Sequence, residues 1–165
     1  MLKDLCLLNG TSGREEAVRN YIIEKIKDKC EYSVDALGSV IAFKKGRKAP
    51  DKKVLVAAHT DEVGFIITDI TDDGYLRFAP VGGIDAAVVL GRRVDINGIK
   101  GVVGAKAVHL LSDDEKKNEP AFDKLAIDIG AADKAEAEKA VSLGDCAYFA
   151  SNYCEFGDGF IKSKA

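Results

Sequence analysis

The chain has 165 residues, of which 47% are apolar and 31% are charged, and its formal net charge at pH 7 is −3. This balance excludes a disordered chain, a collagen-like chain and a small protein held together by disulfides. There is no basic excess to suggest a nucleic-acid partner and no run of about 18 uncharged apolar residues to span a membrane. The length fits one ordinary domain or two small ones.

Cysteine usage and the first residues indicate the cellular compartment. The four cysteines, Cys6, Cys30, Cys146 and Cys154, form no C-x-x-C pair, so a zinc finger or zinc ribbon is not expected. A chain of this size has no need of disulfides. The N-terminal residues lack the basic head, long apolar stretch and cleavage site of a signal peptide. These observations predict reduced thiols and a cytoplasmic location.

Two helices are predicted at the N-terminus. Leucines at positions 2, 5 and 8 indicate a short helix that ends at Asn9-Gly10. Ser12 followed by Glu15 fits the capping-box pattern, and apolar residues recur at helical spacing after it. We therefore expect an amphipathic helix that begins at this box and runs to about Cys30.

Two strands are predicted next, Val40–Phe43 and Val54–Ala58, with a charged loop over residues 44–53 between them. The second strand is apolar at every position, which is typical of a strand buried on both faces in a sheet covered by helices. It ends directly at His59-Thr60-Asp61-Glu62.

From residue 63 onward, short segments of strand character alternate with turns. Asn97-Gly98 is a strong hairpin signal, a short helix is expected from Asp133 as N-cap to Val141, and the charged stretch 112–119 is expected to be a solvated loop. Strands are expected over residues 64–70, 75–79, 87–96, 101–111, 125–129, 145–153 and 159–162. This spacing is typical of a small barrel or sandwich.

His59-Thr60-Asp61 is the motif with the clearest chemical potential. Ligand sites of open α/β sheets gather at the carboxyl ends of strands, and His59 directly follows the predicted buried strand. The i, i+2 spacing can place Asp61 on the same side of an extended chain as His59. A carboxylate on the far N–H is the usual partner of a zinc-bound imidazole. The alternative is a histidine and an acid exposed at the start of a loop.

Other catalytic motifs are weak or missing. Gly101–Lys106 superficially resembles a phosphate-binding loop, but its spacing is wrong and no Ser or Thr follows, so glycines of a curved strand are favoured. There is no G-x-S-x-G nucleophile elbow and no H-E-x-x-H pair. His109 stands among apolar residues and is predicted to be a core or turn histidine.

Over essentially its whole length, the sequence resembles the tetrahedral-aminopeptidase family, whose members are called glutamyl aminopeptidase, deblocking aminopeptidase or endoglucanase-like protein. The run from Val54 to Phe65 is similar to the family's first metal-ligand segment. Other similar segments follow in the family's order: Thr11–Glu16, Asp35–Val40, Leu76–Gly83, Leu90–Val94, Gly101–Gly104, His109–Leu111, Ile127–Ala131 and Gly144–Asp145.

The resemblance implies an α/β zinc-peptidase-like partial domain with an inserted, mostly-β barrel for lid and dimerisation roles. Residues 1–65 would be the N-terminal part of the catalytic domain, residues 66–160 the barrel, and residues 161–165 a return toward the catalytic domain.

The resemblance also implies a function. Such enzymes remove N-terminal residues from peptides with two divalent metal ions, zinc or cobalt. His59 would be a ligand of one metal ion, Asp61 a catalytic residue that orients His59, and the barrel a surface for homo-oligomer formation.

Most of the family's other site residues are missing from these 165 residues. In the family, a segment like Gly159–Ala165 is followed by an L-D-D-R-type motif whose Asp bridges both metals. A Glu-Glu pair that includes the general base, a further Asp and a second His come later. Because a catalytic zinc normally has three protein ligands, we expect the isolated chain to lack peptidase activity and to bind metal weakly at best.

Three hypotheses stay open at this point. The chain is part of an enzyme, as a truncated polypeptide, a proteolytic product or one half of a split gene, and then exposes apolar surface where further strands would pack. Alternatively it is a binding or oligomerisation module whose β domain folds alone. A glycan hydrolase of the endoglucanase-like kind is disfavoured, because the chain has no tryptophan to form a sugar platform.

Overall fold

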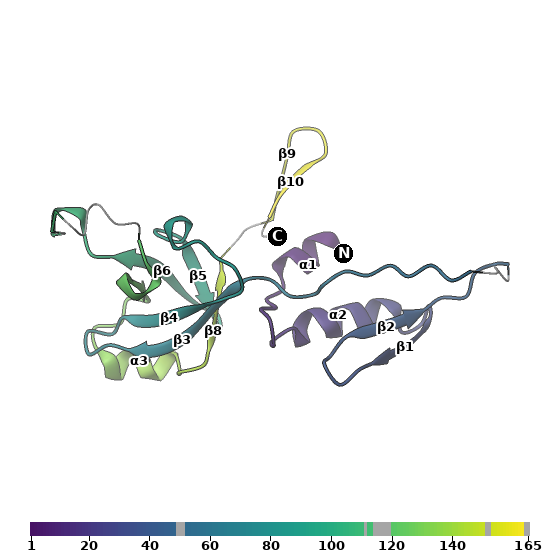
Figure 1. Cartoon of the computed structure of the whole chain (residues 1–165), viewed down its shortest axis with the longest axis horizontal. Coiled ribbons are helices and arrows are strands. Elements are labelled where there is room, and N and C mark those ends of the chain that lie inside the picture. Colours follow the sequence, from purple (N-terminus) through teal and green to yellow (C-terminus); the bar gives the residue numbers. More distant parts are fainter. Residues whose placement is uncertain (49–51, 111, 114–119, 151–152, 164–165) are drawn as a thin grey trace. The chain divides into compact units, whose positions relative to one another are not determined.

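A computed structural model describes residues 1–48, 52–110, 112–113, 120–150 and 153–163. The chain separates into two compact units, residues 1–62 and 63–165, and Figure 1 shows the elements of each in chain order. The expected fold is confirmed, because a partial α/β unit is followed by a closed β-barrel. The expected boundaries at residues 65 and 160 stay a prediction. None of the helices in the described part is long and apolar enough to cross a membrane.

The first unit consists of two helices and a hairpin. Helix α1 covers Leu2–Leu7 and α2 covers Glu16–Ile26. Strands β1 (Glu31–Val34) and β2 (Val40–Phe43) pair antiparallel, and α2 contacts β2. The Tyr21 hydroxyl of α2 donates a hydrogen bond of 2.6 Å to Asp4 of α1, which joins the two helices.

The long helix of the first unit differs from its prediction at both ends. It begins after Glu15, and no side chain caps its first turn. The Ser12 hydroxyl donates to Asp61 instead of capping the helix, so the capping-box prediction is wrong. The helix ends at Ile26, and the chain reaches Cys30 through turns.

The segment 54–58 also differs from its prediction. It belongs to no strand, and Val54, Leu55 and Val56 are 88%, 89% and 88% exposed. The predicted burial on both faces is therefore wrong for this structure. The physical reason is that such a strand needs a neighbour on its edge and a layer on each face, and the described residues of the first unit provide neither.

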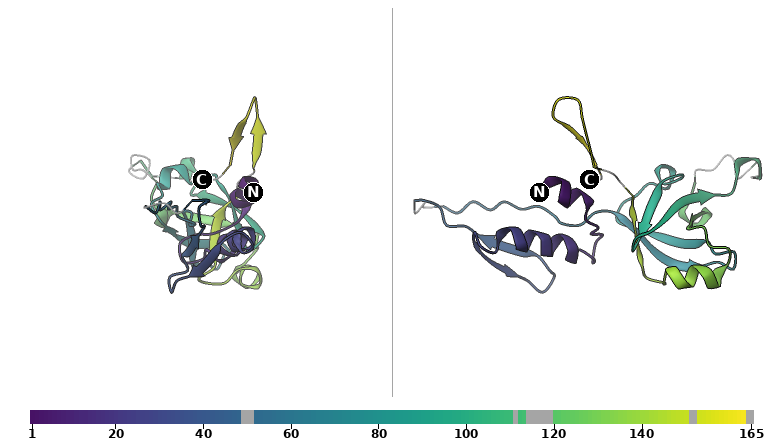
Figure 2. Two further views of the ribbon diagram at one scale, coloured as in Figure 1. Left: turned by 90° about the vertical axis from the view of Figure 1, so that its right-hand side faces the viewer. Right: turned by 180° about the vertical axis from the view of Figure 1, so that it is seen from behind.

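The second unit contains a closed barrel of six strands (Figures 1 and 2). Every neighbouring pair is antiparallel, and closure removes the free sheet edges that would otherwise invite association. The order around the barrel is β3 (Gly64–Ile70), β4 (Leu76–Val81), β7 (Leu125–Asp128), β6 (Ile99–Ala105), β5 (Arg93–Ile96) and β8 (Cys146–Phe149).

Alternate side chains of the barrel strands point inward and form one hydrophobic core. Phe65 and Ile67 of β3 are buried, and a register shift between Ile67 and Asp69 keeps Ile70 inside as well. The Phe65 ring meets Phe78 at a centroid distance of 4.9 Å in an edge-to-face arrangement, which is a favoured aromatic geometry. The core also includes Leu76, Val89, Val94, Ile96, Val103, Leu125, Ile127, Ala137, Val141 and Ala147.

Turn and cap signals in the second unit are confirmed. Asn97 and Gly98 have positive φ angles of 52° and 93° between β5 and β6, as the tight hairpin requires. Helix α3 (Lys134–Ala140) begins at Asp133, whose side chain accepts a hydrogen bond of 2.8 Å from the Glu136 N–H. Such a cap typically contributes about 1 kcal/mol.

Several strands in the second unit are shorter than predicted. In place of the strand predicted over residues 87–96 there is a 3-10 helix (Ala86–Val88) followed by β5, and the strand predicted over residues 101–111 ends at Ala105. A C-terminal hairpin consists of β9 (Cys154–Phe156) and β10 (Phe160–Lys162). Residues 49–51, 111, 114–119, 151–152 and 164–165 lie outside the described residues, and with them most of the predicted loop 112–119.

Candidate functional site

The candidate site is formed by two loops of the first unit. Thr11 and Glu62 form an isolated parallel bridge. The Glu62 N–H donates to the Gly10 carbonyl at 2.8 Å, and the Gly10 N–H donates to Glu62 Oε1 at 3.1 Å. These contacts hold the loop before α2 against residues 59–62.

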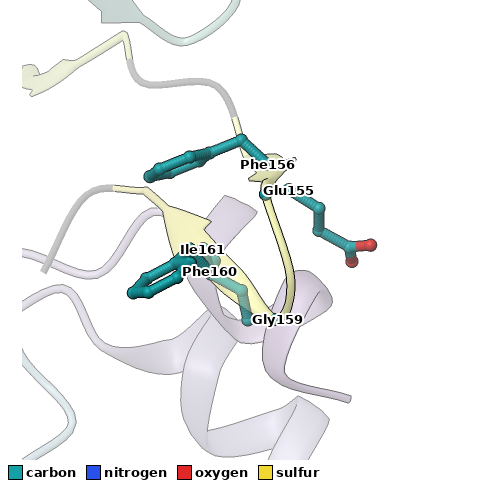
Figure 3. A pocket seen from close by; sticks show the side chains of 6 residues that line it. Glu155, Phe156, Gly159, Phe160 and Ile161 are labelled. Carbon is teal, nitrogen blue, oxygen red and sulfur yellow. The ribbon is translucent and has the colours of Figure 1, made fainter.

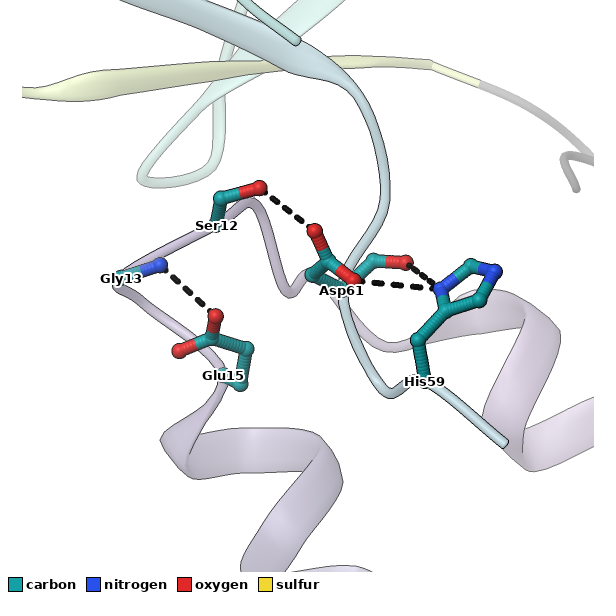
Figure 4. Close-up of polar contacts among 5 residues, drawn as sticks. All are labelled: Ser12, Gly13, Glu15, His59 and Asp61. Atoms are coloured by element: carbon teal, nitrogen blue, oxygen red, sulfur yellow. Dashed lines mark hydrogen bonds and ion pairs between the residues drawn. The ribbon is translucent and has the colours of Figure 1, made fainter. Parts of the chain in front are cut away.

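The structure brings His59 and Asp61 together, as Figure 4 shows. His59 Nδ1 lies 3.1 Å from Asp61 Oδ1 and 2.9 Å from the Asp61 carbonyl oxygen. Both oxygens are hydrogen-bond acceptors, so the ring proton belongs on Nδ1 and the lone pair on Nε2. The His59 side chain is 84% exposed, and Nε2 points away from Asp61. This orientation suits an imidazole that binds a metal through Nε2.

Asp61 is held on its other side by Ser12. The Ser12 hydroxyl donates a hydrogen bond of 2.5 Å to Asp61 Oδ2, so the carboxylate connects Ser12 to the imidazole of His59 (Figure 4). This hydrogen bond is the main reason that the pKa of the Asp61 carboxyl is lowered, and nearby His59 lowers that pKa further, while partial burial opposes the shift. A lowered pKa keeps Asp61 ionised and able to accept both hydrogen bonds at neutral pH.

Replacing Ser12 with alanine is expected to raise the pKa of Asp61 toward the usual aspartate range, because the strongest donor to its charged form is lost. The wild-type contact contributes stability above the unfolded-state pKa and loses it as pH falls through the lowered folded-state pKa. An NMR titration of the Asp61 carboxyl carbon measures the shift. Ser12→Thr, which keeps a hydroxyl, should restore the lowered pKa, and an unchanged pKa in Ser12→Ala would contradict the contact.

Sequence reasoning missed the role of Ser12 because its partner lies 49 residues away. The local pattern pointed to a helix cap, but Glu15 instead accepts a hydrogen bond of 2.7 Å from the Gly13 N–H (Figure 4). This contact shapes the loop and leaves the Ser12 hydroxyl to Asp61. No signal within the loop sequence distinguishes the two arrangements.

The described residues do not form a complete metal centre. His59 and Asp61 have the chemistry of a ligand and its carboxylate partner, but no group of three His, Cys, Asp or Glu side chains within the described residues could hold a metal ion. His109 is exposed in a 3-10 turn, Val108–Leu110, of the second unit. Because a catalytic zinc takes three protein ligands, the donor set does not by itself fit a catalytic metal ion.

A shallow recess lies on the β9–β10 hairpin (Figure 3). Its volume is about 260 Å³, and it is lined by residues of the hairpin itself. The rings of Phe156 and Phe160 stack there with centroids 5.9 Å apart, and Glu155, the one titratable side chain of the lining, points away from the rings. The recess therefore holds no catalytic constellation.

Comparison with known proteins identifies a matching family and several similar proteins. A family model described as M42 glutamyl aminopeptidase matches residues 38–165. A putative aminopeptidase of Acetivibrio thermocellus is 44% identical, with 100% of this chain and 48% of that protein covered. The lysyl aminopeptidase of Pyrococcus furiosus is 32% identical, with 96% and 47% covered. The chain thus spans about half the length of the curated relatives it matches.

Several solved structures are similar to this chain in both sequence and fold. A TET aminopeptidase from a marine sediment Thaumarchaeota archaeon is 36% identical with a TM-score of 0.88, over 96% of this chain and 46% of that one. The Pyrococcus horikoshii TET1 peptidase is 40% identical with a TM-score of 0.78, over 93% and 46%. A Thermotoga maritima protein described as an endoglucanase is 40% identical with a TM-score of 0.80, over 94% and 46%.

Proposed function

Because the chain belongs to the M42 glutamyl aminopeptidase family, we propose that it carries the first metal-ligand segment of an aminopeptidase that removes N-terminal residues from peptides. His59 is the metal ligand and Asp61 the carboxylate that orients it. The observation that supports this assignment best is the contact of His59 Nδ1 with Asp61, which leaves Nε2 exposed. The ions are two divalent metals of the zinc or cobalt type.

Contacts within the chain orient one metal ligand, His59, before a metal ion binds. Asp61 fixes the tautomer and the orientation of His59, and Ser12 fixes the orientation of Asp61. A bound metal ion would polarise the scissile carbonyl and activate water. Ser12 is thus a positioning residue, because it acts on the ligand through Asp61.

The barrel is proposed to support homo-oligomer formation. The Pyrococcus horikoshii TET1 peptidase can assemble into a tetrahedron or a large octahedral shell, and this chain covers the part of such relatives that contains the barrel. A closed barrel offers side-chain surfaces rather than free strand edges for contact. Glycan hydrolysis is not favoured, since the family model is described as an aminopeptidase.

The function is tested by comparing the chain alone with a chimaera. In the chimaera, these 165 residues replace the matched half of the Pyrococcus furiosus lysyl aminopeptidase. The chain alone is expected to release no product from lysyl-p-nitroanilide with Zn²⁺ or Co²⁺, because it provides one ligand where three are needed. The chimaera is expected to release product in a reaction that a chelator stops.

The parent lysyl aminopeptidase serves as the positive control. Robust metal-dependent release by the isolated chain would contradict the ligand argument. A folded chimaera that binds metal but releases no product, under conditions where the parent does, would contradict the proposed function.

A further inference from the structure

We propose that Glu62 is a positioning residue of the candidate site. Its carboxylate holds the loop before α2 (residues 10–15) in place, so that Ser12 of that loop reaches Asp61 and keeps the imidazole of the motif in one orientation. The inference rests on the proposed function, because this orientation matters for catalysis only if His59 binds a metal ion.

The first observation is that Glu62 pairs with both main-chain polar groups of Gly10. The Gly10 N–H donates to Glu62 Oε1 at 3.1 Å, and the Gly10 carbonyl accepts from the Glu62 N–H at 2.8 Å. Hydrogen bonds to a carboxylate are stronger than those to a neutral acceptor. Gly10 is buried, and a buried donor that loses its acceptor is costly. The two contacts together fix where Gly10 lies relative to residues 59–62.

The second observation is the tight packing around Gly10. A Cβ atom at this position would lie 2.8 Å from Val18 Cγ2 and 3.6 Å from the Thr60 carbonyl oxygen. Val18 is buried on α2, and Thr11 beside Gly10 is 0% exposed. Gly10 therefore lies between the helix and residues 59–62, and closely packed surroundings of this kind resist displacement.

The third observation links this position to the imidazole through Ser12. The Ser12 side chain is exposed, so burial does not hold it in place. Its hydroxyl still donates a hydrogen bond of 2.5 Å to Asp61 Oδ2, and Asp61 Oδ1 lies 3.1 Å from His59 Nδ1 (Figure 4). An exposed hydrogen bond between residues that are 49 positions apart needs a main chain that brings both partners together. The contacts between Gly10 and Glu62 do this within two residues of each partner.

The test is NMR spectroscopy of the metal-free 165-residue chain in mildly alkaline buffer, where an exposed imidazole is neutral. Glu62→Ala is expected to speed deuterium exchange of the Gly10 amide by about tenfold, because a buried donor loses its acceptor. It is also expected to weaken the nuclear Overhauser effects between Ser12 and Asp61. The share of the His59 tautomer with its proton on Nε2, read from the ring nitrogen shifts, is expected to rise because Asp61 loses its fixed orientation.

Two single variants serve as matched controls. Glu62→Gln keeps a side-chain oxygen that can accept from the Gly10 N–H, so all three measurements should stay at their wild-type values. Thr11→Val keeps the shape of the neighbouring buried side chain, and the Thr11 hydroxyl has no hydrogen-bond partner among the residues described, so it should change none of them. In the Ser12→Ala background, Glu62→Ala should add no further change in the tautomer share, because coupled residues are not additive.

Each outcome decides the proposal. An unchanged tautomer share in Glu62→Ala would overturn it, as would an equal change in Glu62→Gln or an additive effect in the double variant. Loss of the α2 amide signals in Glu62→Ala would show that Glu62 stabilises the whole unit and would also overturn it. The expected changes in the chain, combined with a chimaera that binds no metal, would leave the role of Glu62 in place and count against the proposed function instead.

Discussion

Replacing Phe65 with alanine is expected to destabilise the barrel by about 3–5 kcal/mol, the usual loss for a large aromatic side chain in a packed core. Phe65 is fully buried, and its ring contacts Phe78 at 4.9 Å, Phe149 at 5.1 Å and Phe122 at 6.3 Å between centroids. Truncation leaves a cavity that three other rings line. Since small domains are stable by about 5–15 kcal/mol, the loss is a large part of the total.

The measurement is urea unfolding followed by NMR signals of the barrel strands. The control is Phe156→Ala on the β9–β10 hairpin, where the same truncation removes a side chain that is 54% exposed. Surface substitutions usually change stability by no more than about 0.5 kcal/mol, so the barrel transition should stay nearly unchanged. Equal losses in the two variants would contradict the assignment of Phe65 to the core.

The barrel was largely predictable because its determinants are local. Asn97-Gly98 specifies a tight turn, Asp133 specifies the start of α3, and the strand predicted over residues 64–70 is present with the same bounds. The boundaries of the segment 87–96 were not predictable, because the Asp85 side chain accepts a hydrogen bond from the Ala87 N–H and starts a 3-10 turn. This turn interrupts a run that is otherwise strand-like in composition.

The first unit was harder to predict because its long-range partners decide its structure. The apolar run 54–58 has the composition of a doubly buried strand, but composition cannot state whether a neighbouring strand is present. Ser12 is a comparable case, since the capping-box pattern is local and its actual partner Asp61 is remote. Both errors concern contacts that depend on residues far away in the sequence.

The core of the candidate site was predictable from spacing alone. His59 and Asp61 are two residues apart in an extended stretch, and the structure places the imidazole beside the carboxylate. The hydrogen bond from Ser12 and the bridge between Thr11 and Glu62 were not predictable, although they determine how rigidly Asp61 is held. The metal-ligand role of His59 stays a proposal that the following experiment addresses.

Replacing His59 with glutamine in the chimaera is expected to lower kcat/KM more than 100-fold, with a parallel loss of bound metal measured by elemental analysis. The reason is that loss of a ligand's carboxylate partner alone typically costs 10–100-fold in metal affinity or activity, and loss of the ligand itself must cost more. Asp61→Asn is therefore expected to lower kcat/KM by 10–100-fold. Ser12→Ala, which acts through Asp61, is expected to lower kcat/KM by less than Asp61→Asn does.

The chain provides a matched control in its other histidine. His109 is also exposed, but it belongs to the second unit, so His109→Gln should change neither metal content nor kcat/KM. A His59→Gln chimaera that keeps its metal and its activity would show that His59 is only an exposed loop residue. The expected loss of kcat/KM is largest for His59→Gln, smaller for Asp61→Asn and smallest for Ser12→Ala. This order follows from the geometry, because a residue that is more hydrogen bonds away from His59 Nε2 has less influence on the metal ion.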